Sequence, residues 1–311
     1  MAQSASYETG RALFADEMVK KHGFHAERIR SLLDRGSYRQ EIIDAMERPH
    51  EAKPWHRYRR LFLTQERISG GLSFWRENAS ILARAQATYG VPPEIVVAIL
   101  GIETSYGSRL GDHRALDALT TLGFSYPKRA DFFRGELEQL LLLGLEGQVD
   151  AARAVGSYAG ALGKPQFIPS SYRAYAVDFD GDGKRDLWGS NADVIGSVAN
   201  YFSQHGWRRG EPVAFRVKVP GALPLGQQVA EKKPVAPNTT VDRLRSAGIE
   251  WQDPVSGAAP ATLVRLDGQE DEYWVGLQNF YVITRYNHSN LYAMAAYQLS
   301  QEIKALYGDG A

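Results

Sequence analysis

One carboxylate ends an otherwise apolar segment, in the stretch GIETSYG that contains Glu103. No charged residue lies between Glu94 and Glu103, and the intervening run IVVAILGI predicts a buried helix that opens at Pro92 and Pro93. A carboxyl group among apolar neighbours has its charged form disfavoured, so its pKa rises and it can donate a proton near neutral pH. Alternatively, Glu103 reaches solvent at the helix end. The spacing alone leaves both interpretations open.

A second carboxylate, which an ordinary glycosidase needs as nucleophile or base, does not accompany this glutamate in the sequence. Asp112 is the nearest following acid, and nothing around it marks it as a partner. Glycosidic chemistry at Glu103 is therefore predicted only for a mechanism that needs a single carboxyl group. The flanking Gly101 and Gly107 would allow a backbone or a ligand to approach closely.

The stretch DFDGDGKRDLWG has the spacing of a calcium loop. Asp178, Asp180 and Asp182 stand at positions 1, 3 and 5, followed by a glycine, as in an EF-hand. The carbonyl group of Lys184 would be the ligand at position 7. Position 12 is a glycine where an EF-hand has its bidentate Glu, so Asp193 is the nearest later acid that can close the site. We expect a structural Ca²⁺ that binds more weakly than in a sensor protein, with a solvated Asp/Gly turn as the alternative.

Other site chemistries find no support in the sequence. The chain has no Cys, which excludes disulfides and thiolate catalysis, and its 7 His residues lack the spacing of a zinc site. No phosphate-binding loop, dinucleotide fingerprint or nucleophile elbow is present, and no organic cofactor is expected. The 36 basic and 36 acidic residues balance, so no net charge attracts the protein to nucleic acid.

The elements that position these residues are predicted to be mainly helical as far as residue 209. SGGLSFWRENASILARAQATYG predicts one helix ending at Gly90, and ADVIGSVANYFSQHG predicts another ending at Gly206. From residue 210 to 285 the pattern changes to period-2 alternation between Pro and Gly, which predicts strands, including the long stretch EYWVGLQNFYVITRY. LYAMAAYQLSQEIKALYG predicts a final helix.

The sequence also bears on membrane association. No apolar run approaches the roughly 18 to 20 residues that a membrane span needs. The first ten residues, MAQSASYETG, lack the basic and apolar regions of a signal peptide. We therefore expect a mature form that reaches a membrane only through an anchor absent from this chain.

Several separate stretches closely resemble the membrane-bound lytic transglycosylase B family and its soluble relatives. They occur in the family's order over about residues 10–305: GIETSYG, SYAGALGKPQFIPSSYRAYAVDFDGDGKRDLW, GSVANYF and YNHSNLYAMA. The resemblance implies a mainly α fold, α+β overall, with a lysozyme-like helical core, a helical domain and a small inserted antiparallel β domain. The implied bounds are 1–77 for the helical domain with the C-terminal helix 286–311, 78–209 for the core with the calcium-type loop 178–193, and 210–285 for the β domain.

The same resemblance implies a peptidoglycan lytic transglycosylase. Such enzymes cleave the β-1,4 bond between N-acetylmuramic acid (MurNAc) and N-acetylglucosamine (GlcNAc) without adding water. The muramyl 6-hydroxyl attacks its own anomeric carbon and leaves a 1,6-anhydro end. One glutamate acts first as acid and then as base, and Glu103 stands at that position. A hydrolytic muramidase on the same fold and a catalytically inactive glycan-binding scaffold are the alternatives.

Further site residues are implied by the resemblance alone. Ser157 matches a residue that contacts the substrate's acetamido group or orients Glu103, and Gln166 matches a substrate-contacting amide. The other implied substrate-binding residues border the same cavity: Tyr58, Tyr286, Asn287 and Tyr292. Core packing is the alternative for the tyrosines, and loop hydrogen bonding is the alternative for Ser157 and Gln166. The implied partners are peptidoglycan glycan strands and cell-wall synthesis proteins, in the periplasm of a Gram-negative bacterium.

Overall fold

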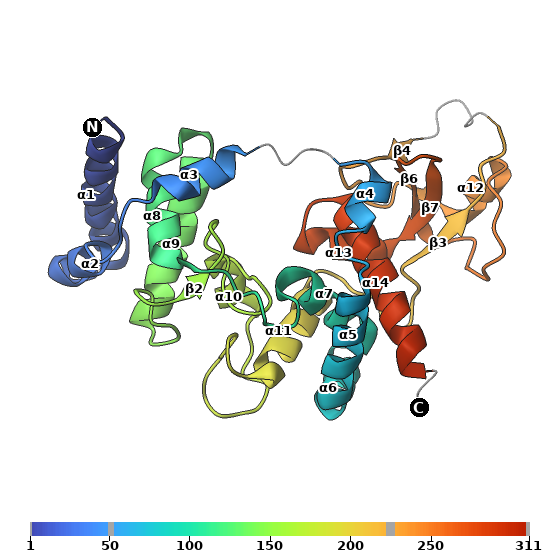
Figure 1. The fold of residues 1–311 in the computed structure, drawn as a ribbon, viewed down its shortest axis with the longest axis horizontal. Coiled ribbons are helices and arrows are strands. Elements are labelled where there is room, and N and C mark those ends of the chain that lie inside the picture. Colours follow the sequence, from blue (N-terminus) through green and yellow to red (C-terminus); the bar gives the residue numbers. More distant parts are fainter. Residues whose placement is uncertain (1, 49–52, 222–227, 309–311) are drawn as a thin grey trace. The chain divides into compact units, whose positions relative to one another are not determined.

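The computed structural model describes residues 2–48, 53–221 and 228–308 (Figure 1). Its contacts divide the chain into two compact units, each made of two separate segments. Unit 1 is Met1–His50 with Gly107–Ser197, and unit 2 is Glu51–Tyr106 with Val198–Ala311. We describe each unit by itself. This division does not follow the boundaries expected near residues 77, 209 and 285, so the three-domain division stays a prediction.

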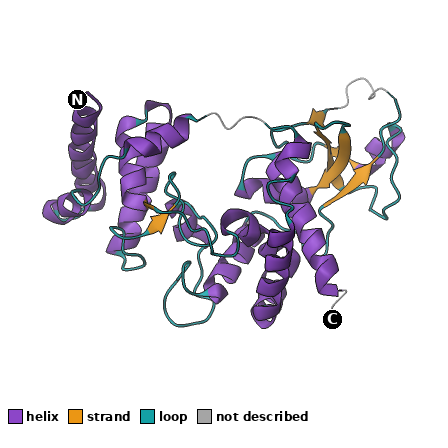
Figure 2. Ribbon diagram, in the orientation of Figure 1, coloured by secondary structure: helices purple, strands orange, loops and turns teal. Residues whose placement is uncertain are grey.

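Unit 1 is mainly helical, and its two short strands pair with each other (Figure 2). Its elements are α1 (Ala2–His22), α2 (Ala26–Leu33), α3 (Gln40–Glu47), β1 (His113–Arg114), α8 (Ala115–Ser125), the 3₁₀ helix η1 (Pro127–Arg129), α9 (Ala130–Leu145), β2 (Val155–Gly156) and α10 (Pro169–Tyr175). Helices α8 and α9 pack together, with α1 and α3 against α8 and with α10 against α9. Helix α11 (Asn191–Gln204) begins in unit 1 and ends in unit 2.

Unit 2 combines a helical part with a small sheet. Its further elements are α4 (Trp55–Arg59), α5 (Gln65–Glu77), α6 (Ala79–Tyr89), α7 (Pro93–Thr104), β3 (Ala214–Val217), β4 (Val229–Ala230), β5 (Thr239–Thr240), α12 (Val241–Ser246), β6 (Pro260–Leu266), β7 (Glu272–Leu277), α13 (Gln278–Tyr286) and α14 (Asn290–Gly308). Helix α14 packs against both α5 and α7. Every residue of α7 except Glu103 is buried, which explains its near-continuous apolar sequence.

The sheet of unit 2 has the strand order β3-β7-β6-β4 (Figure 1). Strand β5 pairs with β6 beside this path. The pairs of this sheet are antiparallel apart from β4, which lies parallel to β6. The strands and α12 enclose a separate apolar cluster of buried residues: Phe215, Val217, Val241, Leu244, Ile249, Ala261, Leu263, Val275 and Leu277. The period-2 pattern of the sequence therefore reflects a real buried face.

Two expected elements are corrected by the structure. The single helix predicted to end at Gly90 is two helices, because the Asn78 side chain donates a hydrogen bond of 2.8 Å to the Phe74 carbonyl and the backbone leaves helical geometry there. The predicted long strand ends at Leu277, and α13 follows it. Asn279 in this helix accepts a hydrogen bond from the Arg208 backbone and donates to the Arg208 carbonyl, contacts that an alternating pattern does not reveal.

No single helix among the described residues is long and apolar enough to cross a membrane. Helices α6 and α7 together pass the length and composition test, but they meet at a bend of 113°. A buried helix of a protein core passes the same test.

Candidate active site

The last turn of α7 carries Glu103. The helix begins with Pro93 at its first position and ends at Thr104, where backbone groups of the following turn satisfy its free carbonyls. The Ser105 amide donates to the Gly101 carbonyl at 3.2 Å, and the Tyr106 amide donates to the Leu100 carbonyl at 3.0 Å. The left-handed Ser105 and its bond to the Gly101 carbonyl form an αL closure of the helix, which holds the turn that carries Glu103.

The backbone directly after α7 is strained. Ser105 has φ 47° and Tyr106 has φ 61°, a left-handed conformation that side chains other than Gly rarely adopt. The only other non-glycine residue with a positive φ among the described residues is Gln166, at 53°. Such conformations cost about 1 to 3 kcal/mol each and persist where surrounding contacts enforce them, often at functional sites.

Tyr106 is held in this conformation by contacts within unit 2. Its hydroxyl donates to the Arg67 carbonyl at 2.6 Å, and its ring stacks on Phe74 at a centroid distance of 5.6 Å. The Arg67 guanidinium in turn donates to the Gly101 carbonyl at 2.8 Å. Arg67 and Tyr106 therefore brace the end of α7.

The structure gives a local reason for each of the two glycines in the stretch GIETSYG. A Cβ atom at Gly101 would lie 2.5 Å from the Tyr106 hydroxyl oxygen, so this glycine makes room for the tyrosine ring. A Cβ at Gly107, which has φ 95°, would lie 2.8 Å from Cε of Lys164. Gly101 thus serves internal packing, whereas Gly107 has a backbone conformation that side chains other than Gly rarely adopt.

Tyr292 of α14 contacts the candidate catalytic group directly. Its hydroxyl donates to Oε1 of Glu103 at 2.5 Å, and the tyrosine is only 2% exposed. Burial raises the pKa of Glu103 from 4.5 to about 7, while the hydrogen bond from Tyr292 opposes part of this rise. At neutral pH both protonation states of Glu103 are therefore populated, as a group that acts as acid and then as base requires.

Tyr58 and Tyr286 also belong to the surroundings of Glu103. Burial raises the pKa of Tyr58 to about 12, with a further contribution from Glu103. Burial and then Glu103 raise the pKa of Tyr286 well above its usual value. Both hydroxyls stay neutral at physiological pH, so each can donate and accept a hydrogen bond near Glu103.

Tyr201 of α11 is a neighbour that the sequence did not single out. Its ring lies 4.9 Å from the Tyr286 ring, and its hydroxyl donates to the Arg285 carbonyl at 2.7 Å. Tyr201 falls in GSVANYF, one of the stretches that carry the family resemblance, and this resemblance is the sequence signal that could have identified it. Asn287 follows α13 in an extended conformation and is exposed. The roles of Tyr58, Tyr286, Asn287 and Tyr292 as substrate contacts stay predictions.

Ser157 and Gln166 lie in unit 1, where both stabilise one loop. The Ser157 hydroxyl accepts hydrogen bonds from the backbone amides of Ala159 at 3.3 Å and Ala161 at 3.1 Å. The Gln166 amide donates to the carbonyls of Gly163 at 3.0 Å and Leu110 at 3.3 Å. These are the loop contacts expected from the alternative interpretation. Since Glu103 belongs to unit 2, a shared cleft stays a prediction.

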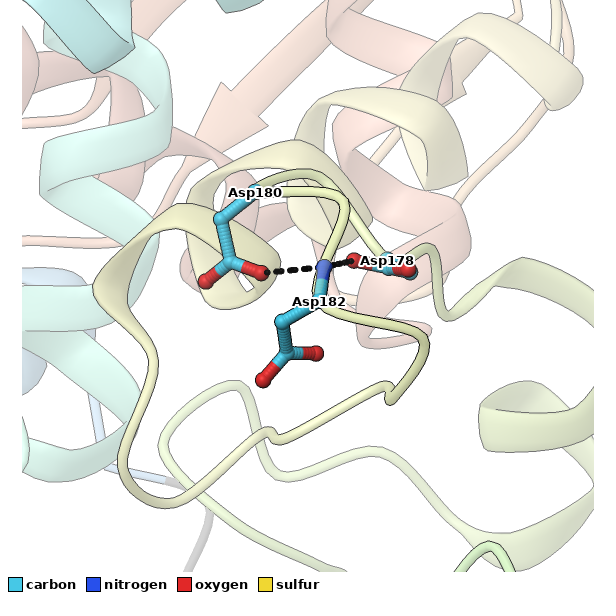
Figure 3. Close-up of side chains that lie close together, drawn as sticks. All are labelled: Asp178, Asp180 and Asp182. Atoms are coloured by element: carbon cyan, nitrogen blue, oxygen red, sulfur yellow. Dashed lines mark hydrogen bonds between the residues drawn. The ribbon is translucent and has the colours of Figure 1, made fainter.

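The acidic loop of unit 1 brings three carboxylates together. Figure 3 shows Asp178, Asp180 and Asp182, whose candidate ligand oxygens all lie within 4.8 Å of one another. The Asp182 amide donates to Asp178 at 3.1 Å and to Asp180 at 3.3 Å, and the amides of Gly181 and Gly183 also donate to Asp178. Clustered carboxylates on a tight turn suit a hard cation such as Ca²⁺.

Asp193 has a different place in the same loop. It is 1% exposed, and its two carboxylate oxygens accept hydrogen bonds from the amides of Phe179 at 2.7 Å and Asp186 at 2.8 Å. It therefore ties the two sides of the loop together. The Lys184 amide donates to Asp182 at 2.8 Å. Ligand roles for Asp193 and for the Lys184 carbonyl stay predictions.

Comparison with known proteins identifies close relatives. Residues 6–301 match the family described as the transglycosylase SLT domain. The membrane-bound lytic murein transglycosylase B of Escherichia coli (strain K12) is 44% identical over 303 residues, which cover 93% of this chain and 81% of that protein. Soluble lytic transglycosylase SltB1 from Pseudomonas aeruginosa is 48% identical, with a TM-score of 0.89 over 96% of this chain and 99% of that one.

Two further solved structures were determined with ligands. The Escherichia coli lytic transglycosylase Slt35 in complex with calcium has a TM-score of 0.86 and 43% identity, over 96% of this chain and 94% of that one. SltB3 from Pseudomonas aeruginosa in complex with NAG-anhNAM-pentapeptide has a TM-score of 0.86 and 30% identity, over 96% of this chain and 79% of that one. These similarities confirm the predicted fold class, a mainly helical lysozyme-like chain with a small sheet region.

Proposed function

The chain belongs to the transglycosylase SLT domain family and is a peptidoglycan lytic transglycosylase, and we propose that Glu103 alone supplies its acid and base chemistry. The observation that carries the proposal is the pKa of about 7 that burial imposes on Glu103 at the end of α7. Burial and the Tyr292 hydrogen bond account for this pKa, and no second carboxylate of the described residues contributes. A mechanism with one carboxyl group fits this environment.

The proposed reaction has two proton transfers and adds no water. Protonated Glu103 gives its proton to the glycosidic oxygen as the bond from MurNAc C1 to that oxygen breaks. The MurNAc 6-hydroxyl oxygen then bonds to C1, and the Glu103 carboxylate takes the hydroxyl proton. The products are a GlcNAc end with a free 4-hydroxyl and a 1,6-anhydro-MurNAc end. Glu103 returns to its protonated state, and the combined product mass equals the substrate mass.

The tyrosines around Glu103 are proposed as substrate contacts, together with Asn287 on the same unit. Tyr292 stabilises the carboxylate form that must accept the second proton. Tyr58 and Tyr286 present neutral hydroxyls, which suit the hydroxyl and acetamido groups of a sugar chain. We also propose that the loop held by Ser157 and Gln166 contributes to glycan binding.

The acidic loop is proposed to bind Ca²⁺ as a structural ion. The clustering of Asp178, Asp180 and Asp182 supports this proposal, and Slt35 was solved in complex with calcium. The ion would fix the loop next to α11, with Lys184 and Asp193 completing its surroundings. A proton donor is what glycosidic cleavage needs here, so these residues have a structural role.

We further propose that the helical, core and β regions serve as three domains. The protein is also proposed to act on glycan strands of the wall, in the periplasm of a Gram-negative bacterium. The name of the Escherichia coli relative supports a wall location, because it describes a transglycosylase that acts on murein. Association with cell-wall synthesis proteins belongs to the same proposal.

Mass spectrometry of digested sacculi tests the reaction. Wild-type protein should release fragments with 1,6-anhydro ends, which are one water lighter than hydrolysis products. Glu103→Gln keeps the shape of the side chain and removes the proton, so turnover should fall by about 10³-fold or more while glycan binding persists. Reducing ends throughout would favour the hydrolytic muramidase, and undiminished release by Glu103→Gln would refute the role of Glu103. Binding by the wild type without any release would indicate an inactive scaffold.

A further inference from the structure

The β3 strand of unit 2 has one unpaired residue on its outer edge. Among the described strands, β3 lies at the end of the sheet and pairs only with β7 (Figure 1). The Leu277 amide donates to the Val213 carbonyl at 3.0 Å, which sets the alternation of the antiparallel ladder. Residues 213, 215 and 217 therefore bond to β7, whereas 214, 216 and 218 direct their backbone groups outward.

The outward groups on both sides of Arg216 are occupied. The Ala214 carbonyl accepts a hydrogen bond from the Tyr297 hydroxyl at 2.9 Å. Lys218 exchanges two backbone hydrogen bonds with Glu250, at 2.9 and 3.0 Å. A continued ladder would place Gln252 opposite Arg216, but the pairing ends at Glu250. Within the described part of the chain, the Arg216 amide and carbonyl have no hydrogen-bond partner.

Two hollows meet at this open position. The first has a volume of about 450 Å³ and is lined by Arg59, Trp274 and Tyr297 among others. The second has a volume of about 1040 Å³ and is lined by Trp251 and Gln252 among others. Arg216, Asp253 and Glu272 line both hollows. The edge therefore offers two backbone hydrogen bonds between two spaces for side chains.

The walls of these hollows carry charges of both signs. The two oxygens of Glu272 accept hydrogen bonds from the indole groups of Trp55 and Trp274, each at 3.2 Å. Glu272, Asp253 and Arg216 take part in no salt bridge within the described ranges 53–221 and 228–308. A ligand with ammonium and carboxylate groups would complement these side chains.

We propose that this edge binds the peptide part of peptidoglycan, which adds to β3 as a short strand opposite Arg216. An exposed strand edge recognises extended peptides through their backbone, while flanking spaces take alternate side chains. Tyr297 and Glu250 close the edge on both sides, which restricts the ligand to a few residues. The stem peptides of peptidoglycan are short and carry free carboxylate and ammonium groups, and the ligand of SltB3 includes a pentapeptide. The choice of this peptide rests on the family's substrate, whereas the site itself is separate from the Glu103 chemistry.

The test uses a stem pentapeptide without sugars, titrated into the full chain by calorimetry. Arg216→Pro removes the outward amide but leaves the β7 ladder intact, because Phe215 and Val217 make those bonds and an edge strand tolerates Pro with its nitrogen outward. Arg216→Ala is the matched control, since it removes the guanidinium and keeps the amide. We expect a loss of affinity of about tenfold or more for Arg216→Pro and a smaller loss for Arg216→Ala.

Hydrogen exchange of the wild-type protein gives a readout that does not depend on the variants folding. Saturating pentapeptide should slow exchange of the Arg216 amide, and the Phe215 amide, already in the ladder, should change little. The proposal is overturned by absence of pentapeptide binding, by an unprotected Arg216 amide, or by equal affinities of Arg216→Pro and Arg216→Ala. Each measurement is independent of turnover, so failure of the Glu103 mechanism would leave it interpretable.

Discussion

The hydroxyl of Tyr292 donates a 2.5 Å hydrogen bond to Oε1 of Glu103, although the two residues are 189 positions apart in the sequence. They meet because α14 packs against α7, which places the start of one helix beside the last turn of the other. Burial favours the protonated carboxyl group, and Tyr292 favours the carboxylate. The balance between the two sets the pKa of Glu103 near the pH at which one group can both give and take a proton.

The Tyr292→Phe substitution should shift the pH dependence of cleavage. Loss of the hydrogen bond removes the influence that lowers the pKa of Glu103, so this pKa should rise above about 7. Because the protonated form starts the reaction, activity falls as pH rises through the pKa of Glu103. The alkaline limb of the profile of kcat/KM against pH should therefore move to higher pH, while kcat falls because the carboxylate form is less stable.

The matched control for this profile is Tyr7→Phe in unit 1, which removes another buried tyrosine hydroxyl, bonded to Thr120 at 3.1 Å. Its pH profile should coincide with that of the wild type. An alkaline limb that stays in place in Tyr292→Phe would contradict the assigned role of the hydrogen bond.

Glu103 should also make stability depend on pH. Its pKa is about 7 in the folded protein against 4.5 ordinarily, so between these values the folded state holds a proton that the unfolded chain has released. Stability should fall as pH rises through this window, by about 3 kcal/mol at most. Glu103→Gln removes this loss, so in urea unfolding it should be more stable than the wild type at pH 8 and similar near pH 4.5.

The exposed Glu17 provides the comparison, because Glu17→Gln should change stability equally little at both pH values. If Glu103→Gln had the same advantage at pH 4.5 as at pH 8, the raised pKa would not be the cause.

Local pattern was enough to predict α7 and its unusual acid. The apolar run before Glu103 can only be a buried element, and a single carboxylate there stands out without any structural knowledge. The tyrosines around it were reached only through family resemblance. Tyr58 and Tyr292 come from helices distant in the sequence, and nothing in their own segments distinguishes them from core residues.

The elements that were mispredicted depend on contacts between distant segments or on local capping. The stretch from Gln278 to Tyr286 alternates well enough for a strand, yet Asn279 bonds to the Arg208 backbone and the segment is helical. Asn78 interrupts a continuous helical pattern by bonding to the preceding turn. The need for a glycine at position 101 could not be predicted from the sequence either. The Tyr106 ring packs back against α7 only because Tyr106 has a left-handed backbone conformation, which its sequence does not indicate.

Calcium should stabilise the protein through the acidic loop. After treatment with a chelator, added Ca²⁺ should raise the melting temperature, and a concentration 100-fold above Kd corresponds to about 3 kcal/mol. Asp182→Asn keeps an oxygen for the Lys184 amide and removes one charge, so it should weaken the calcium response with little change in the metal-free protein. Asp16→Asn, at an exposed aspartate, should leave the response unchanged. An unmoved melting temperature in the wild type would refute the ion.

The brace behind Glu103 should be sensitive to a single methyl group. A Cβ at position 101 would lie 2.5 Å from the Tyr106 hydroxyl oxygen, and the rigid ring cannot turn away without losing its bond to Arg67. Gly101→Ala should therefore destabilise the protein by about 1 to 3 kcal/mol, the usual cost of overpacking, and should lower kcat because the turn that carries Glu103 must shift.

Gly135→Ala is the control, since Gly135 is also helical but exposed, with nothing within 4 Å of an added Cβ. Helix propensity alone should make this variant up to about 1 kcal/mol more stable, at unchanged activity. The two substitutions are chemically identical, so opposite signs in urea unfolding would isolate the contact with Tyr106. If Gly101→Ala also stabilised the protein and kept full kcat, Tyr106 would not be positioning Glu103.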